Sequence, residues 1–129
     1  MNSTTGARPP TANQPRLGWT LLTLAYAAAI FGLSSIPGRD IPLPTGTDKI
    51  AHFVEYVGLG FLATRATGTA LSGFLIAAVY GALDESHQAW VPGRSPDIAD
   101  WVVDVTAALA GVAVSLHFRR RMPGRTVRP

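Results

Sequence analysis

Residues 80–104, YGALDESHQAWVPGRSPDIADWVVD, decide the fold of this 129-residue chain. They carry seven ionisable side chains between two apolar runs: Asp84, Glu85, His87, Arg94, Asp97, Asp100 and Asp104. In an apolar chain such groups are costly to bury, and within a membrane they are functional-site candidates by default. The stretch therefore predicts a polar site built into a hydrophobic, helical framework.

The apolar runs around this stretch predict an all-α integral membrane bundle of four transmembrane helices. Residues 17–36 form a run of 20 residues without a charge. About 20 apolar residues are enough to cross a hydrocarbon core of roughly 30 Å. A cleaved signal peptide fits less well, because no small-residue cleavage site with a hydrophilic domain behind it follows the run. The other helices are expected at about residues 48–66, 69–90 and 96–118, separated by Pro and Gly.

Small residues spaced four apart are expected to let another helix approach closely. They occur in the first and last expected helices: Ala25 with Ala29, Ala28 with Gly32, and Ala107, Gly111 and Ser115. Thr47 and Ser95 are the expected N-caps of the second and fourth helices, since their hydroxyls can accept from free backbone amides. Pro37, Pro42 and Pro44 predict an extended loop after the first helix.

The basic residues predict the orientation of the bundle. Eight fall on the side of the two chain ends, and three, Arg39, Lys49 and Arg94, fall on the other side. The positive-inside rule then places both termini in the cytoplasm and the acidic residues at or near the outer face. We expect a disordered cytoplasmic tail over residues 1–16, a four-helix transmembrane domain over 17–118 and a basic cytoplasmic tail over 119–129.

Three of the expected helices carry a polar stripe on one face, at a similar depth. Helical spacing places His52 one turn from Asp48, Glu55 and Tyr56. The later stripes contain Tyr80, Asp84 and His87 or Gln88, and then Asp97, Asp100 and Asp104. Charge facing lipid is disfavoured, so the three stripes should face one another inside the bundle. Together with Lys49 and Arg94 they predict a small polar pocket that opens outward.

Several roles are open for this pocket. A binding site for a polar or anionic head group would use Lys49 and Arg94, with further contacts from Asp48, Tyr56, Tyr80, Gln88, Asp97 and Asp104. A membrane enzyme acting on a lipid-linked phosphate would use as catalytic groups His52, Glu55, Asp84, Glu85 and Asp100. The alternative is a purely structural role, in which the charges pair with one another and fix the helix register. A structural partner of another membrane protein is the remaining class.

Composition limits the other partners. The chain has no cysteine, which excludes disulfides and thiolate metal sites. The spacing of His52-x-x-Glu55 and of Asp84-Glu85-x-His87 permits a helix-bundle metal site but does not require one, so no metal ligand or cofactor is assigned. The net charge of +3 does not indicate nucleic acid, because the basic excess lies at the chain ends and no base-reading motif is visible. The expected partners are the lipid bilayer and a lipid-linked or cell-wall head group.

Two segments resemble the VanZ-like family of small bacterial membrane proteins. They are DKIAHFVEYVGLGFL at residues 48–62 and YGALDESHQAWVPGRSPDIADWVVDVTAALAG at residues 80–111. The family motifs are of the types Asp-Lys-x-x-His-Phe-x-x-Tyr and Asp-Glu-x-x-Gln-x-x-x-Pro-x-Arg-x-x-x-x-x-Asp. The positions that match are Asp48, Lys49, His52, Phe53, Tyr56, Asp84, Glu85, Gln88, Pro92, Gly93, Arg94, Asp97 and Asp100.

One position departs from the family pattern. Members usually carry an Asn-Thr-x-Gly run in the last helix, where this chain has Asp104-Val105-Thr106-Ala107. The resemblance covers roughly residues 36–114. It implies a multi-pass protein of the bacterial plasma membrane, a role in the cell envelope and, by analogy with the founding member, a link to reduced susceptibility to the glycopeptide teicoplanin.

Overall fold

The computed structural model describes residues 17–40 and 47–121. Over these ranges the chain is all-α, with no strand. Its elements are α1 (Leu17–Ser34), the short 3-10 helix η1 (Gly38–Asp40), α2 (Thr47–Thr67), α3 (Ala70–Gln88) and α4 (Ile98–Arg121). The prediction of four helices is confirmed. The tail expected over residues 1–16, the last residues of the basic tail and the loop prolines Pro42 and Pro44 lie outside the described residues.

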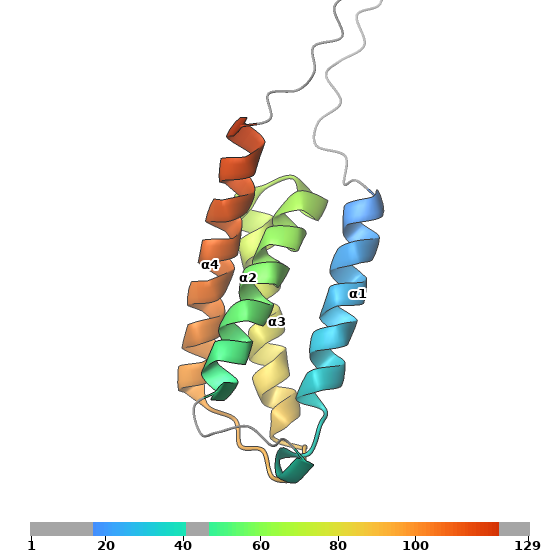
Figure 1. Ribbon diagram of the computed structural model, residues 1–129, viewed down its shortest axis with the longest axis vertical. Helices are drawn as coiled ribbons and strands as arrows, with labels where there is room; N and C mark the ends of the chain where they lie inside the picture. The colour runs from blue at the N-terminus through green and yellow to red at the C-terminus, as the bar shows by residue number, and fades with distance from the viewer. Residues whose placement is uncertain (1–16, 41–46, 122–129) are drawn as a thin grey trace, which may run out of the picture.

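The four helices form an up-and-down bundle (Figure 1). α2 contacts all three other helices and packs most extensively against α4, while α1 packs on α2 and, less, on α3. The start of α1, the α2–α3 turn and the end of α4 lie at one end of the bundle, and η1 and the α3–α4 connection lie at the other. The apolar core is small and is centred on a cluster of Ile30, Tyr56, Leu59, Ala77, Ala107 and Ala108.

Capping residues and a left-handed glycine define the ends of the helices, and two of the predicted caps are wrong. Gly68 ends α2 in the left-handed region at φ 80°, and Thr69 caps α3 by accepting from the Ser72 amide at 3.3 Å. The prediction that Ser95 caps the fourth helix is wrong. α4 begins at Ile98, and the carboxylate of Asp97 accepts a hydrogen bond from the Ala99 amide at 2.8 Å. Thr47 is the first residue of α2 and not its cap.

Two boundaries differ from the sequence expectation. The segment after Pro37 is not extended at its start, because residues 38–40 form a 3-10 turn closed by the Asp40 amide and the Pro37 carbonyl at 2.9 Å. The α4 helix continues through Arg119, Arg120 and Arg121, which were expected in the basic tail. Nothing breaks the helix before Pro123, and cations are favourable at a helix C-terminus.

The small residues have different roles in the two helices. The α4 stripe of Ala107, Gly111 and Ser115 is buried, as predicted. Gly111 lies against the α2 backbone so closely that an added Cβ would overlap the Val57 carbonyl oxygen. The prediction is wrong for α1 inside this chain: Ala25, Ala28, Ala29 and Gly32 are exposed. α1 turns a different face inward, the one that carries Ile30 and Ser34.

The distribution of apolar and charged groups is the reverse of that in a soluble domain. The outer face of α3 carries exposed Leu71, Leu75, Ile76, Val79 and Leu83, while its buried face carries Gly73, Ala77, Gly81, Asp84, Glu85 and Gln88. α1 and α4 are long and apolar enough to cross a membrane, each with a mean hydropathy of 1.6. An apolar outer surface around buried charge is typical of a protein that lies in lipid.

The orientation in the membrane can be measured with reporter fusions. The start of α1 and the end of α4 lie at the same end of the bundle, so we expect both chain termini to face the same compartment. We expect fusions within residues 1–16 and 119–129 to report the cytoplasm, and a fusion in the loop at Pro92 to report the outside. A cytoplasmic signal from the Pro92 fusion would contradict this orientation.

Candidate functional site

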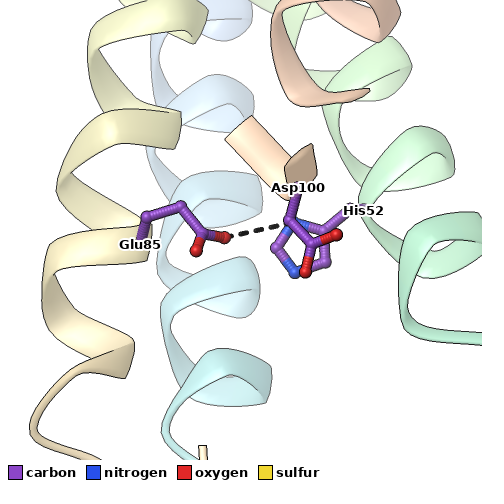
Figure 2. Close-up of side chains that lie close together, drawn as sticks. All are labelled: His52, Glu85 and Asp100. Atoms are coloured by element: carbon purple, nitrogen blue, oxygen red, sulfur yellow. Dashed lines mark ion pairs between the residues drawn. The ribbon is translucent and has the colours of Figure 1, made fainter. Parts of the chain in front are cut away.

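The polar stripes of α2, α3 and α4 meet inside the bundle, at the end that holds η1 and the α3–α4 connection. The buried histidine, glutamine and acidic side chains there are His52, Asp84, Glu85, Gln88, Asp100 and Asp104. Figure 2 shows His52, Glu85 and Asp100 converging from three different helices. The structure therefore brings together members of the three predicted stripes, and it adds Glu85, which the predicted stripe of α3 did not include.

The centre of this cluster is the imidazole of His52. Its Nδ1 lies 2.9 Å from the Asp104 carboxylate, and Asp104 is completely buried. The other ring nitrogen lies 3.4 Å from the Gln88 amide nitrogen, and Glu85 Oε1 is 3.9 Å from Nδ1. Contacts at both ring nitrogens fix the orientation of the ring, as carboxylate and amide partners do for functional histidines. Asp104, the position that departs from the family pattern, is thus the direct partner of His52.

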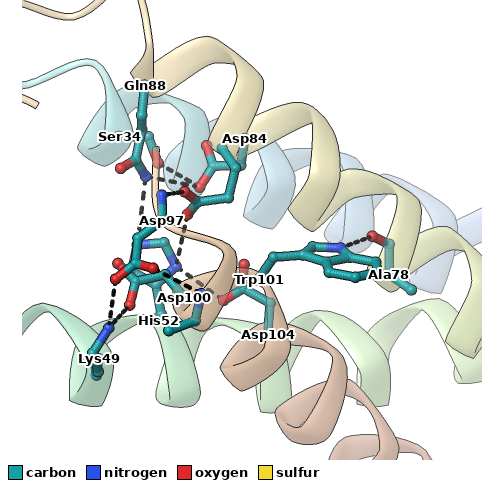
Figure 3. A network of polar contacts seen from close by, with 12 residues as sticks. Ser34, Lys49, His52, Ala78, Asp84, Gln88, Asp97, Asp100, Trp101 and Asp104 are labelled. Carbon is teal, nitrogen blue, oxygen red and sulfur yellow. Dashed lines mark hydrogen bonds and ion pairs between the residues drawn. The ribbon is translucent and has the colours of Figure 1, made fainter. Parts of the chain in front are cut away.

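Asp84 joins α1 to the cluster. The Ser34 hydroxyl donates to Asp84 Oδ2 at 2.9 Å, and the Gln88 amide donates to the same oxygen at 3.4 Å (Figure 3). Ser34 was not among the residues predicted from the sequence. The signal for it was a pair of serines, Ser34-Ser35, at the end of an otherwise apolar run.

Lys49 pairs with α4 and its preceding loop. Its ammonium lies 3.2 Å from Asp97 Oδ2 and also contacts Asp100 Oδ1. Hydrogen bonding from the Ala99 amide and then from Lys49 holds the pKa of Asp97 below its usual value. The Asp97 backbone amide in turn donates to Glu85 Oε2 at 2.8 Å. These contacts connect the starts of α2 and α4 to the end of α3. Lys49 therefore pairs with carboxylates of the bundle, as expected if its role is structural.

A separate pocket of about 60 Å³ lies beside the cluster. Its walls are Leu33, Ser34, Asp48, Ala51, His52, Glu55 and Arg94. Two adjoining turns position Arg94: Gly93 has φ 76°, and the Gly38 amide donates to the Pro92 carbonyl at 3.0 Å. Since a liquid water takes up about 30 Å³, the pocket has room for a small polar group. Arg94 faces this pocket while Lys49 is held by carboxylates, so the two cations do not act at one point.

The tyrosines and His87 differ in their relation to the site. Tyr56 is completely buried and lies parallel to the His52 ring, with centroids 6.2 Å apart. The Tyr80 hydroxyl donates to the Ala27 carbonyl at 2.6 Å, and Tyr80 does not line the pocket. His87 lies outside the cluster, with Nε2 3.0 Å from the Ser35 hydroxyl and its ring 4.4 Å from Phe31.

This arrangement permits two kinds of chemistry. A buried imidazole held by a carboxylate can accept and return a proton beside the pocket. Imidazole and carboxylate oxygens from three helices can also surround a cation. The pocket wall combines the guanidinium of Arg94 with the carboxyl groups of Asp48 and Glu55. It can therefore bind a polar group, and the guanidinium suits an anionic one.

Comparison with known proteins identifies the family. The model of the VanZ/LLP1 family matches residues 10–119, which is most of the chain. No significant match is found among curated proteins or among solved structures. Family membership and the two apolar helices indicate a membrane protein. The chain therefore belongs to the VanZ/LLP1 family.

Proposed function

We propose that this chain is a cell-envelope protein of the bacterial plasma membrane whose pocket binds a polar or anionic head group. The observation that carries the proposal is that the Arg94 guanidinium lies in the pocket wall without an ion pair to a described residue. Its one hydrogen bond to a described residue is to the Ile36 carbonyl, at 3.4 Å. A guanidinium that makes no ion pair is suited to phosphate or carboxylate groups, and the carboxyl groups of Asp48 and Glu55 in the same wall suit hydroxyl or amide groups of the same ligand.

The proposal includes a four-span arrangement, which would put this pocket at the membrane surface. α2 has 21 residues and α3 has 19, which at 1.5 Å per residue is about the thickness of the hydrocarbon core. Their charged residues lie in the bundle interior or at its end, and the lipid-facing side of α3 is apolar. The basic excess near the chain ends favours an outward-facing pocket.

A lipid-linked cell-wall precursor combines the features that such a pocket would recognise. It carries phosphate near the membrane surface, where Arg94 is expected. The adjoining carboxylates would accept hydrogen bonds from its hydroxyl or amide groups. A link to glycopeptide (teicoplanin) resistance follows as part of this proposal, because glycopeptides act on cell-wall precursors.

The buried His52–Asp104 pair favours a second function on the same lipid class. A hydrolase or transferase needs a general base close to its substrate, and His52 both belongs to this pair and lines the pocket. Release of inorganic phosphate from a polyprenyl pyrophosphate, measured with the purified protein, would favour this enzyme over a binding protein.

Head-group binding is tested with variants of Arg94 and Asp84. The probe is a polyprenyl phosphate in detergent micelles, with the uncharged polyprenol as reference, and tryptophan fluorescence as the signal. We expect Arg94→Gln and Asp84→Asn to remain in the membrane. We expect Arg94→Gln to weaken binding of the phosphate by about 10-fold to 100-fold, as expected for a charge-assisted hydrogen bond worth about 1.5–3 kcal/mol.

Arg39→Gln is the matched control, because Arg39 lies on η1 at the same end with its side chain 80% exposed. It should bind the phosphate as the wild type does. Equal affinity of Arg94→Gln and wild type would contradict the proposal. If Arg94→Gln and Asp84→Asn are both lost from the membrane while the lipid-facing variant Leu75→Ile persists, these charges act in helix packing instead.

A further inference from the structure

One imidazole and two carboxylates are placed as ligands of a single cation. His52, Glu85 and Asp100 each offer one ligand atom, and the three atoms lie within 4.8 Å of one another. Two ligands of one ion are separated by at most twice the metal–ligand distance, which is about 4–5 Å for the common divalent ions. The three residues come from α2, α3 and α4, so the site is formed by the bundle and not by a local motif (Figure 2).

Oxygen atoms in this cluster lack partners. Glu85 Oε1 and Asp104 Oδ2 are buried and accept no hydrogen bond within the described part of the chain, and the same is true of Asp84 Oδ1. Glu85 is 7% exposed, and its free Oε1 faces His52 Nδ1 at 3.9 Å, which is too far for a hydrogen bond. Buried carboxylate oxygens are rarely left without a donor or a cation.

The charges around these atoms do not balance. Four carboxylates are buried here, those of Asp84, Glu85, Asp100 and Asp104. Within ion-pair distance of them, among the described residues, lie only His52 and the half-exposed Lys49. Lys49 contacts one oxygen of Asp100 from the rim and also pairs with Asp97. A divalent cation in the centre would offset the remaining negative charge, which is expensive to keep in a low-dielectric interior.

We propose that His52, Glu85 and Asp100 bind one divalent transition-metal ion. The donor set of one imidazole and two carboxylates selects the class of ion, because imidazole favours Zn²⁺ or Fe²⁺ over Mg²⁺ and Ca²⁺, and the two carboxylates also suit Mn²⁺. No cysteine is present to select a thiophilic metal. Asp104 and Gln88 contact the two ring nitrogens of His52, so the ion would replace one of these contacts while the other holds the imidazole in place. This inference is independent of head-group binding, and its test needs no lipid.

The test uses the full-length chain without a histidine tag, purified in mild detergent and treated with EDTA. Titration with Zn²⁺ is followed by calorimetry, and titration with Mn²⁺ by electron paramagnetic resonance. We expect one ion per chain and a rise in the thermal unfolding midpoint of the wild type on adding Zn²⁺. His52→Gln and Glu85→Gln should each weaken binding by at least about 10-fold, because each removes a ligand.

Matched controls exist for both changes. His117→Gln makes the same replacement at an exposed position in the last turns of α4, and Glu55→Gln does so beside the pocket but outside the three-residue group. Both should bind Zn²⁺ as the wild type does. Asp100→Asn tests the ligand on α4 and keeps the test decisive if His52→Gln or Glu85→Gln does not fold, as judged by circular dichroism. The absence of stoichiometric binding, or equal affinity in the ligand variants and the wild type, would overturn the assignment.

Discussion

Replacing Gly111 with alanine is expected to destabilise the bundle by about 3 kcal/mol or more, the upper range for overpacking a tight interface. Gly111 lies where α4 crosses α2, the most extensive helix contact in the chain. A Cβ there would overlap the Val57 carbonyl oxygen and lie 2.8 Å from the Phe61 amide nitrogen. These are backbone atoms, so no side-chain rotation relieves the clash, and the helices must separate.

The measurement is the free energy of unfolding in mixed micelles, with the fraction of folded protein followed by circular dichroism. Gly32→Ala is the matched control, since Gly32 is also helical but an added Cβ meets nothing within 4 Å. It should be neutral or stabilising by up to about 1 kcal/mol, because alanine is the better helix former. Similar losses in the two variants would show that the close contact between α2 and α4 is not what Gly111 provides.

Truncating Tyr56 to alanine is expected to cost about 3–5 kcal/mol of stability, the range for removing a large aromatic side chain from a packed core. Tyr56 is completely buried and belongs to the small apolar core with Leu59 and Ala77. Its ring also lies parallel to that of His52, so its loss would leave a cavity beside the functional cluster. Unfolding in mixed micelles measures the loss.

Tyr56→Phe separates packing from chemistry at the same position. The Tyr56 hydroxyl is buried and has no hydrogen-bond partner among the described residues. Removing it should therefore leave stability unchanged or raise it slightly, since no hydrogen bond is lost. If Tyr56→Phe keeps its stability but loses binding of the polyprenyl phosphate, the hydroxyl acts through the neighbouring His52 ring, because Tyr56 itself does not line the pocket. A destabilised Tyr56→Phe would instead reveal a partner inside the protein.

The sequence by itself determined the number of helices and the chemistry of their inner faces. The length of the run without a charged residue predicted α1. The positions of proline and glycine predicted the ends of the four helices to within a few residues. The i, i+4 spacing predicted that another helix would approach closely at Ala107, Gly111 and Ser115, and these residues are buried. The sequence pattern did not identify the N-cap of α4, because both Ser95 and Asp97 are suitable capping residues. In the structure Asp97 is the cap, and its contacts with Lys49 and Glu85 hold it in position.

Only the tertiary structure decided which polar residues meet. Spacing along one helix gives the angle between its side chains, but not the rotation or axial offset of that helix against its neighbours. Those are decided by close packing, chiefly where Gly60 and Gly111 let α2 and α4 approach. That packing brings His52 to Asp104 and Glu85, separates Lys49 from Arg94 and adds Ser34 to the site. It also turns the small residues of α1 outward, because the face with Ile30 and Ser34 fits the bundle better.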